Sequence, residues 1–436
     1  MGTSVHGRAV VIGASLAGLL TARALHETFE EVVVLDRDTL PERPEPRRGV
    51  PQGGHVHGLL MRGMREMDEM FEGLSAELIG LGAPAFDVQD EMHWWVDGQP
   101  LATGPSGLIG LGVGRPLLEL AIRRRVAALP NVEIRPETAV TDLVTTPDGG
   151  RVVGVRAVAA GEEITIDDAS VVVDASGRGS RARHWLGRLG YPEVEEQRIE
   201  TQVTYVTRRY RRTPDQLDGR YGTAVAAYPG RTRGGFALAQ EGDAWALNVS
   251  GLFGEVPPMD HDGMVAWAAE LDCQDVATLL RTSAPLGDPV KMRYPASTRW
   301  RYDRMSRFPA GFLVTGDAMC SFNPVYGQGM TVAALEATIL GRLLKDGSED
   351  MAAQFFTESA AVIDVPWTTV AANDLRFPDT VGDRSVLDPE PGAYLDRLRA
   401  AAVTDPVLAG AFLRVTQLMD TPAALFGPDI AARVPA

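Results

Sequence analysis

The segment "RAVVIGASLAGLL" near the start of the chain constrains the fold more than any other feature. Residues 8–13 form a short apolar run that ends at a glycine, and leucines then recur at helical spacing as far as Leu25. A second run of β-branched residues, "EVVVLD", follows at 31–36. Strand, helix and strand in this order predict a βαβ unit, and therefore a parallel sheet.

The turn after the first strand carries a degenerate dinucleotide fingerprint, with Gly13, Ser15 and Gly18 at the three positions of G-x-G-x-x-G. A glycine permits the tight turn, a small residue lets a pyrophosphate approach the backbone, and the last glycine lets the helix lie close to the sheet. Asp36 follows at about the 20-residue distance expected of an acid that binds ribose hydroxyls. These residues predict nucleotide binding without separating NAD from FAD. The expected contacts in this unit are Gly13, Ala14, Ser15, Gly18, Asp36 and Arg37.

Two later segments place an aspartate and several glycines directly after an apolar run. The segment "DASGRGSRAR" at 174–183 follows "SVVV", and "GDAMCSFNPVYGQGM" at 316–330 follows "GFLVT" and leads into a helical pattern. Between about 186 and 295, helical periodicity is scarce, and alternating runs such as "QVTYVTRRYRR" and "AWALNVSG" predict antiparallel strands. The sequence therefore predicts an α/β part, an inserted sheet and a mostly helical end.

With the first turn, these two segments resemble the three signatures of flavin monooxygenases of the para-hydroxybenzoate hydroxylase type (group A), which occur in this order. The resemblance covers about residues 8 to 345, and "PQGGHVHGLL" and "GDAMCSFNPVYGQGMTVAALEA" are similar to the epoxidase-like branch that oxidises polyketide or terpenoid alkenes. The resemblance implies an α/β fold: an FAD-binding Rossmann-like domain of the glutathione-reductase type, an inserted antiparallel-sheet substrate domain and a helical C-terminal region. The expected bounds are 1–185 and 296–346 for the two parts of the FAD-binding domain, 186–295 for the substrate domain and 347–436 for the C-terminal region.

The same resemblance implies how the segment at 316–330 contacts FAD. Asp317 would accept a hydrogen bond from a ribityl hydroxyl, and Pro324 would cover the flavin ring. Backbone N–H groups at the start of the next helix would lie beside N1 and the C2 oxygen, where reduced flavin is negatively charged. The further contacts that it implies are Arg48, Arg115, which would reach the pyrophosphate, Val140, whose backbone would meet adenine, Asp174, Gly177, Gly327, Gln328, Gly329 and Met330.

No Ser/His/Asp order and no paired-carboxylate spacing identifies a protein nucleophile or general acid. We therefore assign no catalytic residue, and expect a flavin C4a-hydroperoxide to transfer one oxygen atom by hydroxylation or epoxidation. The substrate, a hydrophobic or aromatic secondary metabolite, is expected between the inserted sheet and the flavin. No metal site is expected, because the histidine pair at 55 and 57 has no evident partner ligand. Candidate lining residues are His55, Tyr205, Phe236, Trp245, Phe253, Phe322 and Trp367.

Charge and composition limit the partners of the chain. The net charge of −16 disfavours nucleic acid and anionic membranes, and no apolar run is long enough to span a bilayer. Two cysteines agree with a reducing compartment, so a cytoplasmic location is expected. The expected small-molecule partners are O₂, the hydrophobic substrate and NAD(P)H as a transient reductant, because no second dinucleotide fingerprint occurs. A separate flavin reductase could instead supply reduced flavin.

Other functions stay open at this stage. A flavin reductase of isoprenoid double bonds would share the three motifs, and a non-catalytic FAD-binding protein is a further alternative. The WxWxIP signature of flavin halogenases is absent, so halogenation is not expected. Neither the identity of the substrate nor the oligomeric state follows from the sequence.

Overall fold

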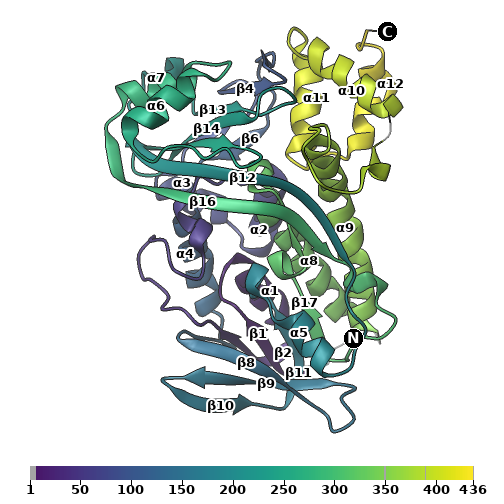
Figure 1. Cartoon of the computed structure of the whole chain (residues 1–436). Helices are drawn as coiled ribbons and strands as arrows, with labels where there is room; N and C mark the ends of the chain where they lie inside the picture. Colours follow the sequence, from purple (N-terminus) through teal and green to yellow (C-terminus); the bar gives the residue numbers. More distant parts are fainter. Residues whose placement is uncertain (1–5, 348–349, 388, 436) are drawn as a thin grey trace.

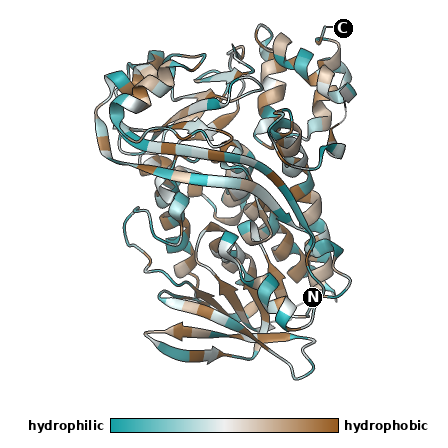
Figure 2. Cartoon of the chain, in the orientation of Figure 1, coloured by the Kyte–Doolittle hydropathy of each residue, from teal (hydrophilic) through white to brown (hydrophobic). Residues whose placement is uncertain are grey.

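The computed structural model describes residues 6–347, 350–387 and 389–435. Its central element is a parallel sheet in the lower half of Figure 1, with strand order β17-β11-β1-β2-β7. Strand β1 pairs in parallel with β11 and β2, and β11 pairs in parallel with β17. The strands are β1 (His6–Ile12), β2 (Phe29–Leu35), β7 (Val132–Arg135), β11 (Ala169–Asp174) and β17 (Phe312–Val314). They are mostly hydrophobic in Figure 2, as expected of parallel strands covered on both faces.

The register of this sheet brings the three sequence motifs to one edge. Ile12 is paired with Leu35 and with Asp174, and Asp174 is paired with Val314. Parallel strands that end in register leave their following loops side by side, and ligands bind outside these carboxyl ends. The first turn and the segments after β11 and β17 are therefore neighbours.

Helices cover the parallel sheet and share one large hydrophobic core with it. Helix α1 packs against α8, and α2 also contacts α8. Two short strands of this part, β3 (Ala85–Asp87) and β6 (Ile109–Leu111), pair with each other. The helices are α1 (Leu16–Leu25), α2 (Met61–Met70), α3 (Leu74–Gly80), α4 (Arg115–Ala127), α5 (Ala182–Arg188) and α8 (Gly329–Asp346).

A small antiparallel sheet lies beside the parallel one. Its three strands follow each other in the chain and pair in the order β10-β9-β8, and β9 also contacts β11. They are β8 (Thr138–Thr145), β9 (Val152–Ala159) and β10 (Glu162–Ile166). This sheet lies within residues 1–185, the range expected for the first part of the FAD-binding domain.

The large sheet in the upper half of Figure 1 has the order β18-β16-β12-β15-β14-β13-β4-β5. Its strands β4 and β5 precede the residues expected for the inserted domain, and β4 pairs with β13 in parallel, so the sheet is not wholly antiparallel. Helices α6 (His261–Ala269) and α7 (Asp275–Thr282) cover one face. The strands are β4 (Met92–Val96), β5 (Gln99–Pro100), β12 (Glu196–Arg211), β13 (Gly222–Val225), β14 (Arg233–Gln240), β15 (Ala244–Gly251), β16 (Pro285–Trp300) and β18 (Cys320–Ser321).

The C-terminal region is helical, as predicted. It consists of α9 (Met351–Asp374), α10 (Pro389–Ala401), α11 (Pro406–Thr416) and α12 (Pro428–Ala431). In Figure 1, α9 runs from α8, against which it packs, towards the large sheet, and the last three helices lie beside that sheet. Among the described residues, no helix combines the length and the apolar character needed to cross a membrane. The predicted fold class, α/β with a second sheet and a helical end, is confirmed.

Candidate functional site

The first turn is held together by contacts within the chain. Gly13 has a φ of +105°, and a Cβ there would lie 2.7 Å from the carbonyl oxygen of Ala175. A Cβ on Gly18 would lie 1.8 Å from the carbonyl oxygen of Gly13. The N–H of Ala14 donates to Asp36 Oδ2 at 2.7 Å. Both glycines are therefore required by the backbone itself, whether or not a nucleotide is bound.

A buried ion-pair network surrounds this turn. Arg47 Nη1 lies 3.2 Å from Asp36 Oδ1, and Arg47 Nε donates to Glu119 Oε1 at 2.8 Å. Arg115 Nη2 donates to Ser15 Oγ at 2.9 Å, and that hydroxyl donates to Glu119. Burial alone would raise the pKa of Glu119, but the guanidinium groups of Arg115 and Arg47 outweigh it and lower this pKa. The first turn thus carries acids whose charge is already neutralised.

Of four further residues expected at the nucleotide, one takes part in this network. Arg115 is the first residue of α4 and takes part in the network, whereas Arg37 and Arg48 are exposed. Val140 is half-buried on β8 and packs against the main core. The arginine next to Arg48 in the sequence, Arg47, is the one that turns inward, and its Nη2 is buried without a partner in the described part of the chain.

The loop after β11 supplies hydrogen-bond donors to its own aspartate, Asp174. Asp174 is fully buried, and its carboxylate accepts from the Ser176 N–H at 2.9 Å and from Ser180 Oγ at 2.7 Å. Burial raises the pKa of Asp174, against the effect of these hydrogen bonds. Asp174 therefore shapes the loop, and Gly177 has a φ of +74°, with a Cβ there lying 4.0 Å from Asp317 Cβ.

The turn after β17 presents a half-buried aspartate that accepts no hydrogen bond from the described residues. Asp317 lies in a short 3₁₀ turn (Gly316–Ala318), and none of the described side chains donates to its carboxylate. Burial raises the pKa of Asp317, although Arg178 and Arg115 act in the opposite direction. A Cβ on Gly329 would lie 3.5 Å from Asp317 Oδ1, an ordinary contact, so this side of the turn has room. Helix α8 begins at Gly329, so its N-terminus lies beside this carboxylate.

A second buried acid fixes the position of this turn. Glu336 on α8 is fully buried, and its Oε2 accepts from Thr315 Oγ1 at 2.6 Å and from the Gly316 N–H at 2.7 Å. Burial raises the pKa of Glu336 to about 7. Glu336 Oε1 and Gln328 Oε1 are buried without partners among the described residues. In contrast to the first turn, the acids here face no ion-pair partner in the part of the chain that the structure describes.

The residues present fit FAD. Two helix N-termini, those of α1 and α8, lie at the edge where β1, β11 and β17 end, and helix N-termini favour anionic groups. Asp317 and Gln328 Oε1 could accept hydrogen bonds, and Arg47 Nη2 could donate one. Gly329 leaves space that a side chain would fill. Pro324 and Gly327 belong to the same turn, and Met330, on α8, is buried.

Four of the expected substrate-lining residues fall into two groups. The His55 ring lies 4.6 Å from the Tyr205 ring, and His55 Nδ1 lies 2.8 Å from Thr207 Oγ1. Burial lowers the pKa of His55 to about 4, so this imidazole is neutral at pH 7. Phe322 and Trp367 lie in the main core, with ring centroids 6.5 Å apart.

Two further expected residues, Phe236 and Phe253, lie on strand β14 and just after strand β15. Phe236 pairs with Asn248, which pairs with Thr207, so Phe236 shares the face of Thr207. Phe253 contacts Phe377, with centroids 5.5 Å apart.

The expectation for Trp245 is wrong. Trp245 pairs with Tyr210 and packs with it into the core under α6 and α7. Side chains alternate between the two faces of a strand, so Trp245 points away from the face that bears Tyr205.

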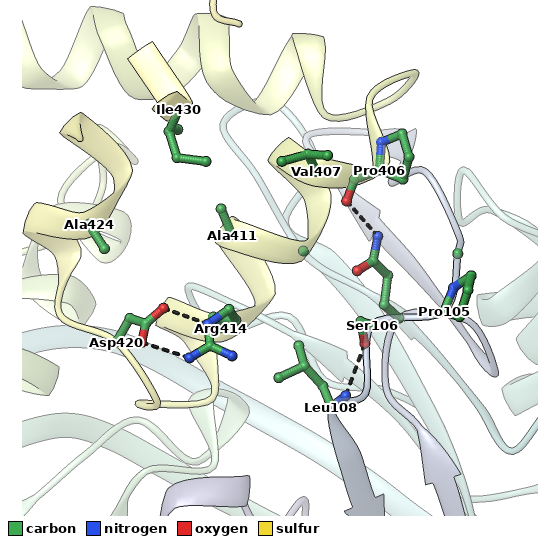
Figure 3. A pocket seen from close by; sticks show the side chains of 13 residues that line it. Pro105, Ser106, Leu108, Pro406, Val407, Ala411, Arg414, Asp420, Ala424 and Ile430 are labelled. Atoms are coloured by element: carbon green, nitrogen blue, oxygen red, sulfur yellow. Dashed lines mark hydrogen bonds and ion pairs between the residues drawn. The ribbon is translucent and has the colours of Figure 1, made fainter. Parts of the chain in front are cut away.

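A separate cavity of about 530 Å³ lies between α11 and the segment at 104–108 (Figure 3). Leu108, Val407 and Ile430 contribute apolar side chains to it. At its edge, Arg414 Nε and Nη2 donate to the Asp420 carboxylate at 2.6 and 2.9 Å. None of the residues predicted to bind the cofactor or the substrate lines this cavity.

Sequence reasoning missed the acids and the arginine that organise the two turns. Arg47 and Glu119 belong to the first turn, and Glu336 to the second. A signal existed for Glu336, which is the one acid within the apolar helical run "TVAALEATIL". No local signal separates Arg47 from Arg48, because both stand in the same loop.

Comparison with known proteins supports these observations. No family model matches the chain. The chain is 36% identical over 436 residues to Protein Rv3254 of Mycobacterium tuberculosis, covering 95% of this chain and 90% of that protein. It is 27% identical over 378 residues to a kynurenine 3-monooxygenase of Salinispora arenicola, covering 81% of this chain and 76% of the relative. The solved structure of the flavin-dependent brominase Bmp2 superposes with a TM-score of 0.69 at 17% identity, covering 97% of this chain and 96% of that one.

The brominase shares the fold, whereas the sequence relatives identify the family. The three motifs occur in the expected order, and the fold brings them to one edge of the parallel sheet. The relatives include FAD-dependent monooxygenases that align with most of this chain. The chain is therefore an oxidoreductase that belongs to the FAD-dependent monooxygenases of the para-hydroxybenzoate hydroxylase type.

Proposed function

We propose that this enzyme inserts one oxygen atom from O₂ into a hydrophobic or aromatic secondary metabolite, by hydroxylation or epoxidation through a flavin C4a-hydroperoxide. NAD(P)H is the transient reductant in this proposal. The observation that carries the assignment of the flavin site is the Asp317 carboxylate, which has no hydrogen bond among the described residues and lies beside the N-terminus of α8. Asp317 is half-buried, and the neighbouring Gln328 Oε1 is buried without a partner among the described residues; such desolvated groups are unfavourable unless a ligand supplies a donor.

Each part of the proposed site has one task. The first turn and Arg47 bind the pyrophosphate and ribose, and Asp317 accepts a hydrogen bond from the ribityl chain. The N–H groups of Gly329 and Met330 lie at the positive end of α8 and stabilise negative charge on the pyrimidine edge of the ring. Bound FAD, once reduced, supplies the reaction with O₂. The protein orients the substrate and excludes water.

The substrate class rests on the face of the large sheet that bears Tyr205. His55, Tyr205 and Phe236 are aromatic, and the imidazole of His55 is uncharged at pH 7. Thr207 and Asn248 add neutral polar groups on the same face. Aromatic walls with a few neutral polar groups suit a hydrophobic or aromatic molecule. Residues 1–185 and 296–346 would bind FAD, the large sheet would bind the substrate, and residues 347–436 would close one side.

Product analysis under labelled oxygen tests the proposal. The purified enzyme with FAD and either NADH or NADPH is incubated with a panel of polyenes and aromatics under ¹⁸O₂. We expect one labelled oxygen atom in the product, and a transient flavin–oxygen adduct in stopped-flow spectra. Saturated products without label, or turnover confined to carboxylated amino acids, would contradict it. If activity requires an added flavin reductase, NAD(P)H is not the direct reductant of this enzyme, and the proposed oxygen transfer still holds.

A further inference from the structure

The carboxylate of Asp374, the last residue of α9, is buried against the turn that precedes α8. Asp374 is 3% exposed. Its Oδ1 accepts from the Tyr326 hydroxyl at 2.7 Å, and its two oxygens lie 3.4 and 3.3 Å from Asn323 Nδ2. Burial raises the pKa of Asp374 to about 6, while both partners act in the opposite direction. Asp374 thus links the C-terminal region to a turn of the FAD-binding part.

The two partners of Asp374 bracket Pro324, the residue expected over the flavin ring. Asn323 is 1% exposed, its side-chain oxygen accepts from the Val325 N–H at 3.2 Å, and its own N–H donates to Ser297 Oγ at 2.9 Å. The short 3₁₀ turn (Pro324–Tyr326) is therefore anchored at both ends, while Pro324 itself is exposed. Gly327 and the N-terminus of α8 follow directly.

The residues after Asp374 also contact the large sheet. Arg376 donates through both terminal nitrogens to Asp97, at 2.8 and 3.2 Å, and Asp97 lies in the turn between β4 and β5. Arg399 Nε on α10 donates to the same carboxylate at 2.7 Å. The segment 374–376 is therefore tied both to the turn with Pro324 and to the sheet proposed to bind the substrate.

We propose that Asp374 is a positioning residue that sets the height of the turn with Pro324 relative to the flavin ring. The inference rests on the proposed function, because it assumes that this turn covers the ring. Without the carboxylate, the Tyr326 hydroxyl and the Asn323 amide lose their acceptor, and the turn is free to shift. Among the described residues, the side-chain hydrogen bonds of Asp374 go to Tyr326 and Asn323 and not to Asp317 or the first turn, so we expect binding of the nucleotide part of FAD to be unaffected.

The test compares Asp374→Asn and Tyr326→Phe with Glu358→Gln. The Asn variant keeps the size of the side chain but sets one amide N–H₂ against that of Asn323, and Tyr326→Phe removes a single hydroxyl. Glu358 is on the same helix, is paired with Arg342 at the surface and serves as the matched control. The readouts are the visible absorption and circular dichroism of bound FAD, its Kd, and the share of NAD(P)H oxidation that ends as hydrogen peroxide.

We expect Asp374→Asn to change the flavin spectrum and to raise the peroxide share at least threefold, with the Kd for FAD within about threefold of wild type. Tyr326→Phe should shift both readouts in the same direction by less, and Glu358→Gln should leave them unchanged. A wild-type spectrum and peroxide share in both variants, with only a lower melting temperature, would overturn the inference. The spectra and the Kd do not require turnover, so failure of the wild type to oxygenate any substrate would count against the proposed function alone.

Discussion

The two glycine-containing turns at the edge of the parallel sheet serve the same proposed ligand in different ways. In the first turn, the glycines at 13 and 18 are required because a side chain would collide with the backbone. In the second turn, Gly316 and Gly327 are restricted too, because a Cβ would lie 2.8 Å from Ala17 Cβ and 2.9 Å from the Gly58 carbonyl oxygen, whereas Gly329 meets only an ordinary contact at 3.5 Å. The acids of the two turns also differ in their charged partners. Glu119 is paired with arginines, whereas Asp317 and Glu336 have no ion-pair partner in the described chain.

This difference separates the residues that the fold requires from those that FAD binding is proposed to require. The charged side chains of the first turn are paired with one another, although Arg47 Nη2 stays buried without a partner in the described chain. The second turn buries polar groups that the described chain does not satisfy, and such groups are costly unless a ligand supplies partners. Substitutions of Gly18 and Glu119 should therefore affect stability, and substitutions of Gly329 and Asp317 should affect FAD binding.

Gly18→Val should have the largest effect. Its Cβ would lie 1.8 Å from the Gly13 carbonyl oxygen, a backbone atom that cannot move without opening the turn between β1 and α1. We expect a loss of more than about 4 kcal/mol of stability, enough to prevent accumulation of folded protein. Circular dichroism and thermal melting check this, with Gly187→Val, which meets no atom within 4 Å, as the control. A folded Gly18→Val protein with wild-type melting would remove the steric basis of the comparison.

Glu336→Gln should change how stability depends on pH. Burial raises the pKa of Glu336 from 4.5 to about 7, so the folded protein holds a proton that the unfolded chain releases between these values. Stability from this group is therefore full below pH 4.5 and is lost as the pH rises to about 7, by roughly 3 kcal/mol. We expect the variant to lack this decline. Urea unfolding of the FAD-free proteins between pH 4.5 and 8 measures it.

Glu119→Gln is the matched substitution in the first turn, and its effect should have the opposite sign. The pKa of Glu119 is lowered, so its contribution is present above the ordinary value of 4.5 and is lost as the pH falls through the folded-state value. The variant should weaken the protein mainly at neutral pH, because two buried arginines lose their shared partner. If both variants changed the pH profile in the same direction, the electrostatic contrast between the turns would be refuted.

The meeting of the three motifs was predictable because it depends on local features and on one rule of topology. Each motif follows an apolar run, and parallel strands that end in register bring the following loops together. The residues that complete the turns were less accessible. Arg47 and Arg48 are adjacent in a loop rich in proline and glycine, and only the folded path of the chain decides which of them turns inward.

The large sheet shows a second limit. Strand β15 is buried on both faces, so its alternation does not reveal that Trp245 packs into the core under α6 and α7 and not on the face expected to line the substrate. The pairing of β4 with β13 joins residues far apart in the sequence, and no local pattern encodes it. The predicted contacts with FAD stay predictions, and the next two substitutions are designed to test them.

Gly329→Val should leave the fold intact and prevent FAD binding. The backbone at Gly329 is in a conformation that any residue adopts, and a Cβ there meets only Asp317 Oδ1 at 3.5 Å. The added methyl groups would occupy the space proposed for the ring. We expect the Kd for FAD to rise at least about 100-fold, or roughly 2.7 kcal/mol, with unchanged melting of the FAD-free protein. Wild-type affinity in this variant would show that the flavin lies elsewhere.

Asp317→Ala should have the smallest of these effects and the most specific one. Removing a charged acceptor that binds a ribityl hydroxyl should weaken FAD binding by about 2 kcal/mol, or roughly 30-fold. The FAD-free protein should keep or gain stability at pH 7, because burial raises the pKa of this carboxylate and its ionised form is unfavourable without a ligand. Asp317→Asn retains a carbonyl acceptor without the charge, so its affinity for FAD should lie between those of the wild type and Asp317→Ala. Calorimetric titration with FAD distinguishes the three proteins. If Asp317→Ala binds FAD as tightly as the wild type while losing stability, the carboxylate serves the fold, and the two turns would not differ in the way proposed.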